Sequence, residues 1–358
     1  MINGMTSLHY IILQTTYAIQ GDRTINGIIH ILRGKRSAQT IQDISLFQLE
    51  QSAAILKNEP KKYVDAKANE LLENGWIVEN SDRGVNLSTV GNMAREKLLE
   101  KYNIPDTYHG LKYEWNHSSY YFWEQLSLLV QTISYLKDKQ SAFIPVSYDR
   151  IAQNKVKQLL QKYHDIDYIG DQVYQEIERV LSNKTEKEAT LFVNRLTSNF
   201  RTGRTFDQLS SIYYGDRLYT SIVFRSTLHD MIAKANEDRK NNPILSYFQI
   251  DRDGTFTITQ TSTVTKKLFE EGYSLDEIAK RRNLKHSTIE DHVIELAIHD
   301  PNFNFDSFIT GEQLQEIEKE MKRLNTRKLK PIKDEFGDKY TYFQIRLAIS
   351  SYKGEWSQ

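Results

Sequence analysis

The chain has 358 residues, of which 39% are hydrophobic, 11% aromatic and 26% charged, and its formal net charge is zero. This length allows two or three domains, the composition excludes a disordered chain, and the neutral charge confines any nucleic-acid contact to local patches. The absence of cysteine excludes disulfides, thiolate zinc sites, iron–sulfur clusters and thiol catalysis, and it is consistent with a cytoplasmic protein.

Residues 1–105 are predicted to form a winged-helix-like domain. Thr24 has the position of an N-cap, and a further helix begins at Thr89. Two short β-prone runs on either side of residues 80–84 predict a hairpin. Helices followed by a two-stranded hairpin give the order of a winged helix. The helices that apolar spacing and turn signals indicate before the hairpin cover residues 8–19, 25–32, 40–56 and 63–74.

A small basic patch in this domain consists of Arg33, Lys35 and Arg36, followed by polar residues. Cations beside hydroxyl and amide side chains are suited to phosphate contact. A solvated surface without a partner explains the same residues equally well. We therefore treat the three cations as candidate contacts with DNA or with a partner protein.

Residues 106–250 are predicted to form a helical middle domain. The aromatic run at residues 120–123 could stack on bases, but its helical spacing favours buried packing. Residues 205–209 and 219–232 resemble a second helix-turn-helix in outline. The sequence gives this domain no role beyond joining the two ends of the chain. Its expected helices cover residues 119–136, 150–163, 171–182, 186–199 and 217–236.

The most informative segment is residues 263–299. A helix over 263–271 is followed by a second over 275–282, which Ser274 caps with Glu277 at capping-box spacing. Asn283 takes a turn position that needs a left-handed backbone. Ser287 is expected to cap a third helix over 288–299, whose apolar residues face the core. The pattern predicts a helix-turn-helix with the third helix as its recognition helix, and an ordinary helical hairpin is the alternative.

The segment from Glu277 to His292 resembles the helicase helix-turn-helix domain found after the catalytic cores of some RecQ-family helicases. Its particular marks are Arg282 before the turn and the Thr288-Ile289-x-x-His292 phrase. LuxR-type regulators look similar, but the position of Arg282 is usually apolar there. The likeness covers roughly residues 260–353, within a C-terminal domain expected at 260–358. The full-length layout also resembles a stand-alone bacterial protein of this group that lacks the helicase core.

The expected recognition helix is too acidic for a typical major-groove reader. Its predicted exposed positions include Glu290, Asp291 and Glu295, and carboxylates repel phosphates. His292 belongs to the helix-turn-helix pattern and is expected to be structural or to face a partner. The candidate nucleic-acid or partner contacts of this domain are Lys285, Ser287, Thr288, His292, Arg327, Lys328, Lys330, Lys333 and Arg346.

Motifs of the common catalytic sites are missing from the sequence. It contains no Walker phosphate loop, no Gly-x-Gly-x-x-Gly, no His-Glu-x-x-His and no Gly-x-Ser-x-Gly. The pairs His164-Asp165, His229-Asp230 and His299-Asp300 could hold a metal in a helical phosphohydrolase, but chance surface pairs explain them better. We therefore predict a protein that is not an enzyme, with no catalytic residue, no cofactor and no metal site.

Neither a membrane segment nor a secretory signal is expected. No stretch approaches the roughly 18 apolar residues that a membrane span needs. The N-terminus lacks a basic lead and a cleavage site. These features, with the missing cysteines, predict a cytoplasmic protein without a membrane partner.

The resemblance implies a non-catalytic, DNA-associated accessory protein that partners a RecQ-type DNA helicase in DNA repair or recombination. The reason is that a domain usually fused to such helicases occurs here without the helicase core. Direct contact with DNA is left open. The alternative is a helix-turn-helix transcription regulator, which the acidic third helix and the neutral charge disfavour, and a metal-dependent phosphohydrolase is a distant third.

Overall fold

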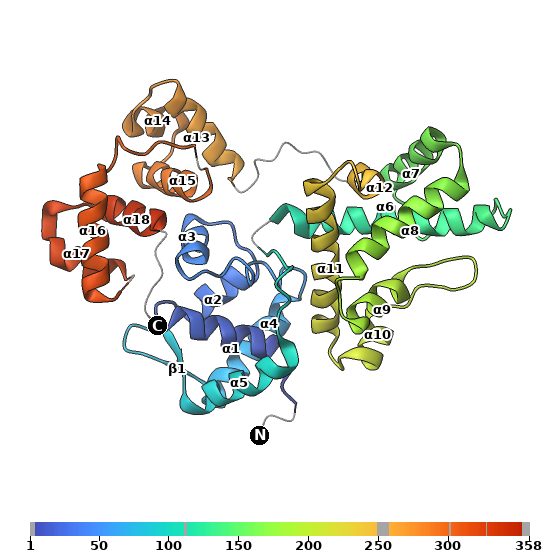
Figure 1. Ribbon diagram of the computed structural model, residues 1–358. Coiled ribbons are helices and arrows are strands. Elements are labelled where there is room, and N and C mark those ends of the chain that lie inside the picture. Colours follow the sequence, from blue (N-terminus) through green and yellow to red (C-terminus); the bar gives the residue numbers. More distant parts are fainter. Residues whose placement is uncertain (1–3, 111–112, 249–257, 301, 327, 353–358) are drawn as a thin grey trace. The chain divides into compact units, whose positions relative to one another are not determined.

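The computed structural model describes residues 4–110, 113–248, 258–300, 302–326 and 328–352, and within them the chain is almost entirely helical (Figure 1). The predicted mainly α fold is confirmed, since the described residues form eighteen α-helices and one two-stranded sheet. Contacts divide the chain into two compact units. Unit 1 consists of Met1–Tyr10 and Ala94–Gly254, and unit 2 of Ile11–Met93 and Thr255–Gln358. The three-domain division of the sequence stays a prediction.

The N-terminal part of the chain has the order of a winged helix, as predicted. Thr24 accepts a hydrogen bond from the Gly27 amide and begins the second helix. The hairpin pairs its two strands antiparallel, and the Val85 amide also donates to the Arg23 carbonyl at 3.0 Å. Gly84 lies so close to Gly21 that an added Cβ would be 1.8 Å from the Gly21 oxygen. The elements are α1 (Ser7–Ile19), α2 (Ile25–Leu32), α3 (Ala38–Leu46), α4 (Lys61–Glu73), β1 (Ile77–Glu79), β2 (Val85–Leu87) and α5 (Thr89–Tyr102).

The third helix is shorter than predicted. It ends at Leu46 rather than at residue 56, because Gln48 and Ala54 have left-handed backbones, with φ of 53° and 56°. The amides of Ala54 and Leu56 donate to the Ile31 and Leu32 carbonyls at 3.0 and 2.8 Å. These bonds satisfy carbonyls at the end of α2, so the segment after α3 serves as a cap for α2 instead of continuing α3.

The C-terminal part of unit 2 is a compact group of helices, coloured orange and red in Figure 1. Its buried core includes Val293, Ile317, Ile332, Phe343 and Leu347. A smaller cluster of Ile278, Ala279 and Ile289 joins the two helices of the predicted motif. The elements are α13 (Gln260–Glu270), α14 (Leu275–Arg282), α15 (His286–His299), α16 (Gly311–Leu324), α17 (Leu329–Phe336), the 3-10 helix η1 (Gly337–Lys339) and α18 (Tyr342–Ser351).

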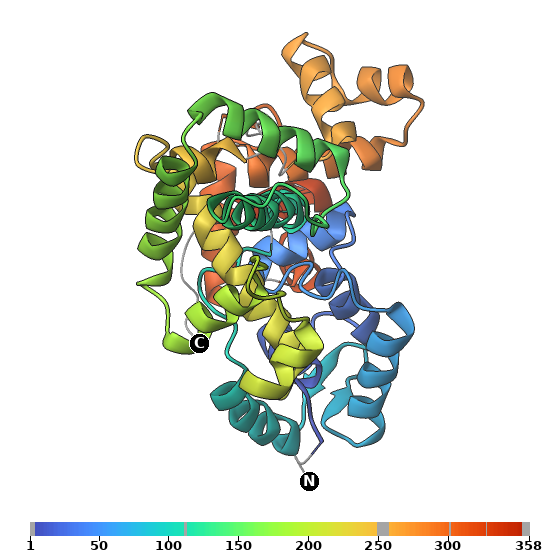
Figure 2. The same ribbon diagram turned by 90° about the vertical axis from the view of Figure 1, so that its right-hand side faces the viewer.

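Unit 1 is built around the long helix α11 (Arg217–Glu237), against which α6 (Tyr113–Lys137), α8 (Ile166–Leu181) and α9 (Glu186–Arg195) pack (Figure 2). The Trp123 ring meets Phe192 and Phe224 edge-on, with centroids 5.5 and 4.8 Å away, and Phe122 is buried. Buried packing of the aromatic run is therefore confirmed for Phe122, whereas Trp123 packs on other rings but is half-buried and Tyr120 is exposed. The remaining helices are α7 (Arg150–Tyr163), α10 (Phe206–Tyr213) and α12 (Pro243–Tyr247).

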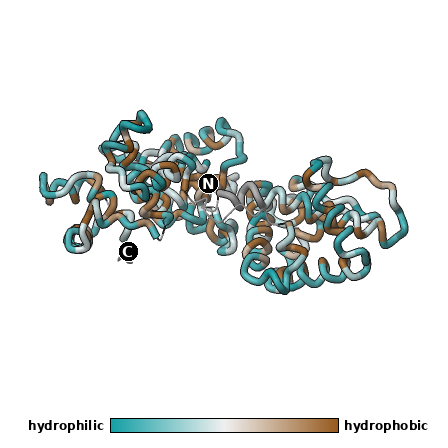
Figure 3. The backbone as a smooth tube through the Cα atoms, turned by 90° about the horizontal axis from the view of Figure 1, so that it is seen from above, coloured by the Kyte–Doolittle hydropathy of each residue, from teal (hydrophilic) through white to brown (hydrophobic). Residues whose placement is uncertain are grey.

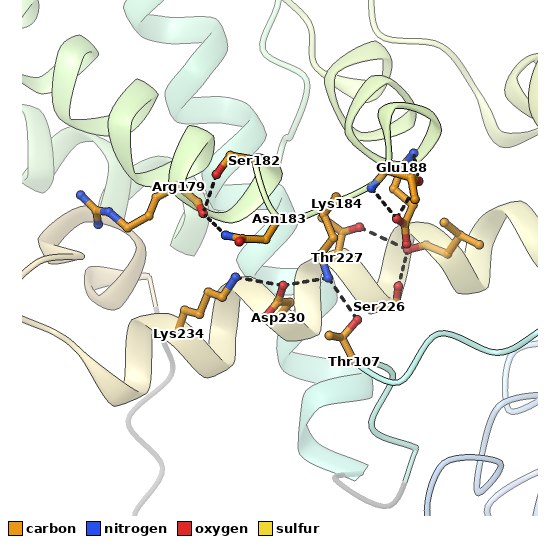
Figure 4. Close-up of polar contacts among 12 residues, drawn as sticks. Thr107, Arg179, Ser182, Asn183, Lys184, Glu188, Ser226, Thr227, Asp230 and Lys234 are labelled. Atoms are coloured by element: carbon orange, nitrogen blue, oxygen red, sulfur yellow. Dashed lines mark hydrogen bonds and ion pairs between the residues drawn. The ribbon is translucent and has the colours of Figure 1, made fainter.

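Hydrophobic and hydrophilic stretches alternate along the helices of both units, as expected for helices that each bury one face (Figure 3). In unit 1, ion pairs between side chains also join the helices. Lys184, between α8 and α9, lies 2.8 Å from Asp230 on α11, and Lys234 lies 3.3 Å from the same carboxylate (Figure 4). Lys184 also donates to the Thr107 hydroxyl at 3.3 Å. This ion cluster ties the α8–α9 turn and the chain before α6 to α11.

We expect Asp230→Ala to lower the free energy of unfolding by about 3–5 kcal/mol, because it leaves the buried Lys184 ammonium without its counter-charge. Chemical denaturation of the full chain measures this. Glu335→Ala, which removes an exposed partner of Arg323, is the control and is expected to change nothing measurable. An Asp230→Ala protein as stable as this control would contradict the account.

Candidate nucleic-acid interface

The helix-turn-helix motif forms largely as its local sequence predicts. Ser274 accepts from the Glu277 amide while the Glu277 carboxylate accepts from the Ser274 amide, which is a complete capping box. Asn283 is left-handed, with φ 51° and ψ 46°, and the Leu284 amide donates to the Ala279 carbonyl at 3.0 Å. These contacts reverse the chain between α14 and α15. The helix-turn-helix prediction is confirmed.

The beginning of the third helix differs from the prediction. α15 starts at His286, and Lys285 is its N-cap residue without a side-chain cap bond. Ser287, the expected cap, lies inside the first turn and is exposed. The reason is the tight turn, since the Thr288 amide already donates to the Lys285 carbonyl at 2.9 Å. Lys285, Ser287 and Thr288 therefore lie at the N-terminal end of α15, where Lys285 and Ser287 face solvent and Thr288 is half-buried.

Arg282 and His292, which the sequence singles out, form a network of hydrogen bonds inside the helix-turn-helix. Arg282 donates to the Thr261 carbonyl at 2.7 Å and to the Thr261 hydroxyl at 2.8 Å, and it also reaches the Thr265 hydroxyl. The His292 ring contacts Thr265 through Nδ1 at 2.8 Å and Thr261 through Nε2 at 3.3 Å. Arg282 and His292 thus join α14 and α15 to α13. Their conspicuous pattern in the sequence reflects packing of the motif.

His292 is only 6% exposed, so from this position it cannot contact DNA or a partner. Its assignment as a contact is corrected, and of the two roles expected for it the structural one is observed. Burial, together with the nearby Arg282 cation, lowers the pKa of His292 to about 4. The imidazole is therefore neutral at physiological pH. Neutrality is required here, since a charged ring would face a guanidinium in a buried position.

The three carboxylates expected on the exposed face of the third helix are not free. Glu295 is 3% exposed and accepts bonds from the Ser262 hydroxyl at 2.6 Å and from the Thr259 hydroxyl at 3.0 Å. Its predicted exposure was wrong, because it caps the N-terminal end of α13 from 33 or more positions away in the sequence. Asp291 lies 2.8 Å from Arg346, and Glu290 lies 3.5 Å from His286.

Burial continues on every side of α15 over five consecutive residues, 292–296. The helix packs against α13 and α14 of its own motif, against α18, and against α3 from the N-terminal part of unit 2. Residues 292–296, which are buried, cannot contact base edges in a major groove. The doubt about sequence reading by this helix thus rests on burial rather than on its acidity.

Three of the predicted phosphate contacts are engaged inside unit 2. Arg346 donates from Nε to the Gln42 side chain at 3.1 Å, in addition to its ion pair with Asp291. Lys328 lies 2.9 Å from Asp22, and Lys333 donates to the Tyr340 carbonyl at 2.7 Å and to the Gly337 carbonyl. These bonds hold the N-terminal and C-terminal parts of unit 2 together or close the end of α17.

Other predicted contacts remain accessible. Lys330 on α17 is exposed, and no ion pair or hydrogen bond of its side chain is present among the described residues. Lys285 is exposed at the turn, where Lys280 and Arg281 are its exposed neighbours, with the Arg281 guanidinium 4.0 Å from the Tyr273 ring. The predicted contact Arg327 lies outside the described residues.

The N-terminal basic patch includes a residue that sequence reasoning missed. Arg33 donates to the Glu59 carbonyl at 2.7 Å, which brings the start of α4 to the end of α2. The pKa of His30 is lowered mainly by burial and then by the charges of Lys35 and Lys61, so both cations lie near that ring. Lys35 and Arg36 are exposed, and so is Lys61. The signal for Lys61 in the sequence was the Pro-Lys-Lys step at residues 60–62, but nothing local links it to residue 35.

The three His-Asp pairs serve packing and helix ends. Asp165 caps α8, Asp230 belongs to the ion cluster of unit 1, and Asp300 lies 2.7 Å from Lys266. His229 is fully buried, so the prediction of a surface pair was wrong for His229-Asp230. Among the described residues no group of three or more histidines and carboxylates could hold a metal ion. In that part of the chain none of the helices is long and apolar enough to cross a membrane.

Taken together, the fold and the motif define a mainly helical protein of the helix-turn-helix class. The sequence profile of a family described as a helix-turn-helix domain matches residues 261–349. Over 351 residues the chain is 30% identical to Protein YpbB of Bacillus subtilis (strain 168), which covers 96% of this chain and 98% of that relative. The chain belongs to the YpbB family. No solved structure gives a significant match. A helix-turn-helix domain in a member of this family indicates a DNA-associated protein.

The neutral state of His292 gives unit 2 a definite pH dependence. In the unfolded chain the ring has its ordinary pKa of 6.5, whereas in the folded protein the pKa is about 4. The unfolded state therefore binds more protons between these values, and stability falls as pH decreases through that window. His292→Gln, which cannot be protonated, is expected to weaken this fall. Urea unfolding near pH 7 and near pH 5 measures it.

A second histidine provides the control. Burial also lowers the pKa of His299 to about 4, so part of the pH dependence persists in His292→Gln and a further part is lost in the double variant with His299→Gln. A single variant whose stability falls with acid as steeply as that of the unaltered chain would show that His292 is not held neutral.

Proposed function

We propose that the protein is a non-catalytic, DNA-associated accessory protein that works with a RecQ-type DNA helicase in DNA repair or recombination, in the cytoplasm. The observation that carries the proposal is the helix-turn-helix whose third helix is buried over residues 292–296 while cations before it and on other elements are exposed. Such a module is suited to sequence-blind backbone contact or to protein contact. Residues 292–296 of α15 are not suited to reading base edges, because they are buried.

The exposed cations lie on several separate elements. Lys285 stands at the turn before α15, Lys330 on α17, and Lys35 with Lys61 at the end of α2 and the start of α4. Each of these cations is a candidate phosphate contact. Arg33, Arg36, Ser287 and Thr288 lie near them in the chain and are candidate contacts at the same places. Several weak contacts on one chain raise the effective concentration of a bound helicase at its DNA substrate.

A transcription regulator remains the alternative, and the N-terminal part of unit 2 is the observation that favours it. There α4 directly precedes the hairpin and exposes Lys61, Lys62 and Tyr63. A regulator requires tight binding to one defined site, with affinity typically 10³–10⁷ above that for other sequences. Competition between defined and random duplexes distinguishes the two functions.

The proposed function is tested by fluorescence anisotropy with single-stranded, duplex and forked DNA, with and without a RecQ-type helicase from the same cell. We expect sequence-blind binding that weakens with salt, directly or only with the helicase. Replacing Lys35, Lys285 and Lys330 by Ala is expected to reduce the slope of log affinity against log salt by about 1 for each phosphate contact removed.

Lys187→Ala, which removes an exposed cation on α9, is the matched control and is expected to leave the slope unchanged. Absence of binding in every condition, with the helicase present as well as without it, would contradict the proposed function. A protein that prefers one duplex sequence by three orders of magnitude would establish the regulator instead.

A further inference from the structure

The loop between α9 and α10 in unit 1 exposes an aromatic ring. Phe200 is 84% exposed, which is the highest value for a large hydrophobic side chain among the described residues. The loop extends beyond the ends of the two helices that it joins (Figure 1). Single exposed apolar residues are common, so exposure alone carries no conclusion. The bonds that hold the loop and the cations in the loop or beside it add to this observation.

The loop is held in one conformation by its own hydrogen bonds. The Ser198 amide donates to the Arg201 carbonyl at 2.8 Å and forms the turn that carries Phe200. The Arg204 amide donates to the Asn194 carbonyl at 2.8 Å, which joins the second half of the loop to the end of α9. Gly203 makes this close approach possible, because an added Cβ would be 2.2 Å from the Arg195 oxygen.

The loop is also fastened to α6. The Asn199 amide donates to the Ser134 hydroxyl at 3.2 Å, and that hydroxyl donates to the Asn199 side chain at 2.6 Å. Asn199 further donates to the Asp138 carboxylate. The neighbours of Phe200 on both sides are therefore fixed, and the ring is displayed on a rigid support. Such preorganisation lowers the conformational entropy lost when a ligand binds.

Three cations lie in the loop or beside its attachment to α6. Arg201 and Arg204 are exposed in the loop, and Lys139 is exposed directly after Asp138. The Arg201 guanidinium donates to the Val193 carbonyl at 2.8 Å and to the Asn194 side chain at 3.1 Å, so it is positioned at the end of α9. Among the described residues the one carboxylate bonded to the loop is that of Asp138. Three cations against one carboxylate favour an anionic ligand.

We propose that this loop binds single-stranded DNA, with Phe200 stacked on an unpaired base and Arg201, Arg204 and Lys139 near the flanking phosphates. An exposed aromatic ring between cations is the arrangement with which proteins bind single strands without sequence preference. The inference rests on the proposed association with DNA and gives the middle of the chain a part in it. A purely apolar partner surface would leave the three cations unexplained.

The test compares Phe200→Ala, Phe200→Leu and Phe200→Trp in the full chain, by anisotropy with an oligothymidine and with a duplex. We expect Phe200→Ala to weaken single-strand binding on the order of tenfold, and Phe200→Leu not to restore it, since stacking needs a ring. Phe200→Trp is expected to bind like the unaltered chain, with tryptophan fluorescence quenched by the oligonucleotide. Duplex binding is expected to change little in all three variants.

Tyr174→Ala, which removes another exposed ring of unit 1, is the matched control and is expected to bind the single strand normally. Unfolding midpoints of the variants verify that the exposed substitutions leave the fold intact. If the unaltered chain binds single strands and Phe200→Ala binds them equally well, the loop proposal is wrong while the proposed function stands. If the unaltered chain binds no DNA in any condition, the proposed function fails and the loop proposal fails with it.

A protein ligand for the loop is a separate outcome of the same variants. Phe200→Ala could abolish self-association in light scattering, or capture of the helicase, and leave the affinity for single strands unchanged. This result would show that the loop binds a protein surface and not DNA, and it would overturn the proposal. Arg204→Ala separates charge from stacking. We expect it to weaken single-strand binding at low salt and to have a smaller effect at high salt. Added to Phe200→Trp, it is expected to leave the fluorescence quenching intact.

Discussion

The burial of α15 over residues 292–296 is the constraint on which unit 2 depends. One face of this helix is covered by the other helices of its motif, through the hydrogen bonds of Arg282 and His292 to α13. The other faces are covered by α18 and by α3, whose Leu46 packs on the C-terminal core. Because α3 belongs to the N-terminal part of the chain and α18 to its end, burial of one helix brings both parts into one unit.

Burial of α15 changes the function that a helix-turn-helix can have. In a DNA reader the N-terminal residues of the recognition helix contact base edges in the major groove. Here the N-terminal end of α15, from Lys285 to Ser287, is exposed, whereas residues 292–296 are buried. The exposed residues that could bind a ligand lie in three places: the turn before α15, the exposed side of α17, and the patch at Lys35 and Lys61. Phosphates or a partner protein can be reached from such positions.

Most features set by neighbours in the chain were predictable, although the cap expected at Ser287 was not formed, and features set by distant partners were missed. The Ser274 capping box, the left-handed Asn283 and the Thr24 cap depend on contacts within a few residues, and sequence reasoning found all three. Glu295 was misplaced because its partners on α13 lie far away in the sequence. The same holds for Arg346, whose exposure is removed by Gln42, 304 positions away. A helical pattern assigns faces, but it does not say how many neighbours a helix will have.

Hydrogen exchange of the full chain, followed for the peptides of α15 and α18, tests the central claim most directly. If α3 covers these helices, Leu46→Asp is expected to speed their exchange markedly, while a substitution of the exposed Lys62 on α4 leaves it unchanged. The amides of residues 292–296 are expected to exchange among the slowest in unit 2 of the unaltered chain. Rapid exchange of these amides, or exchange of α15 and α18 that is indifferent to Leu46→Asp in a folded variant, would contradict the account.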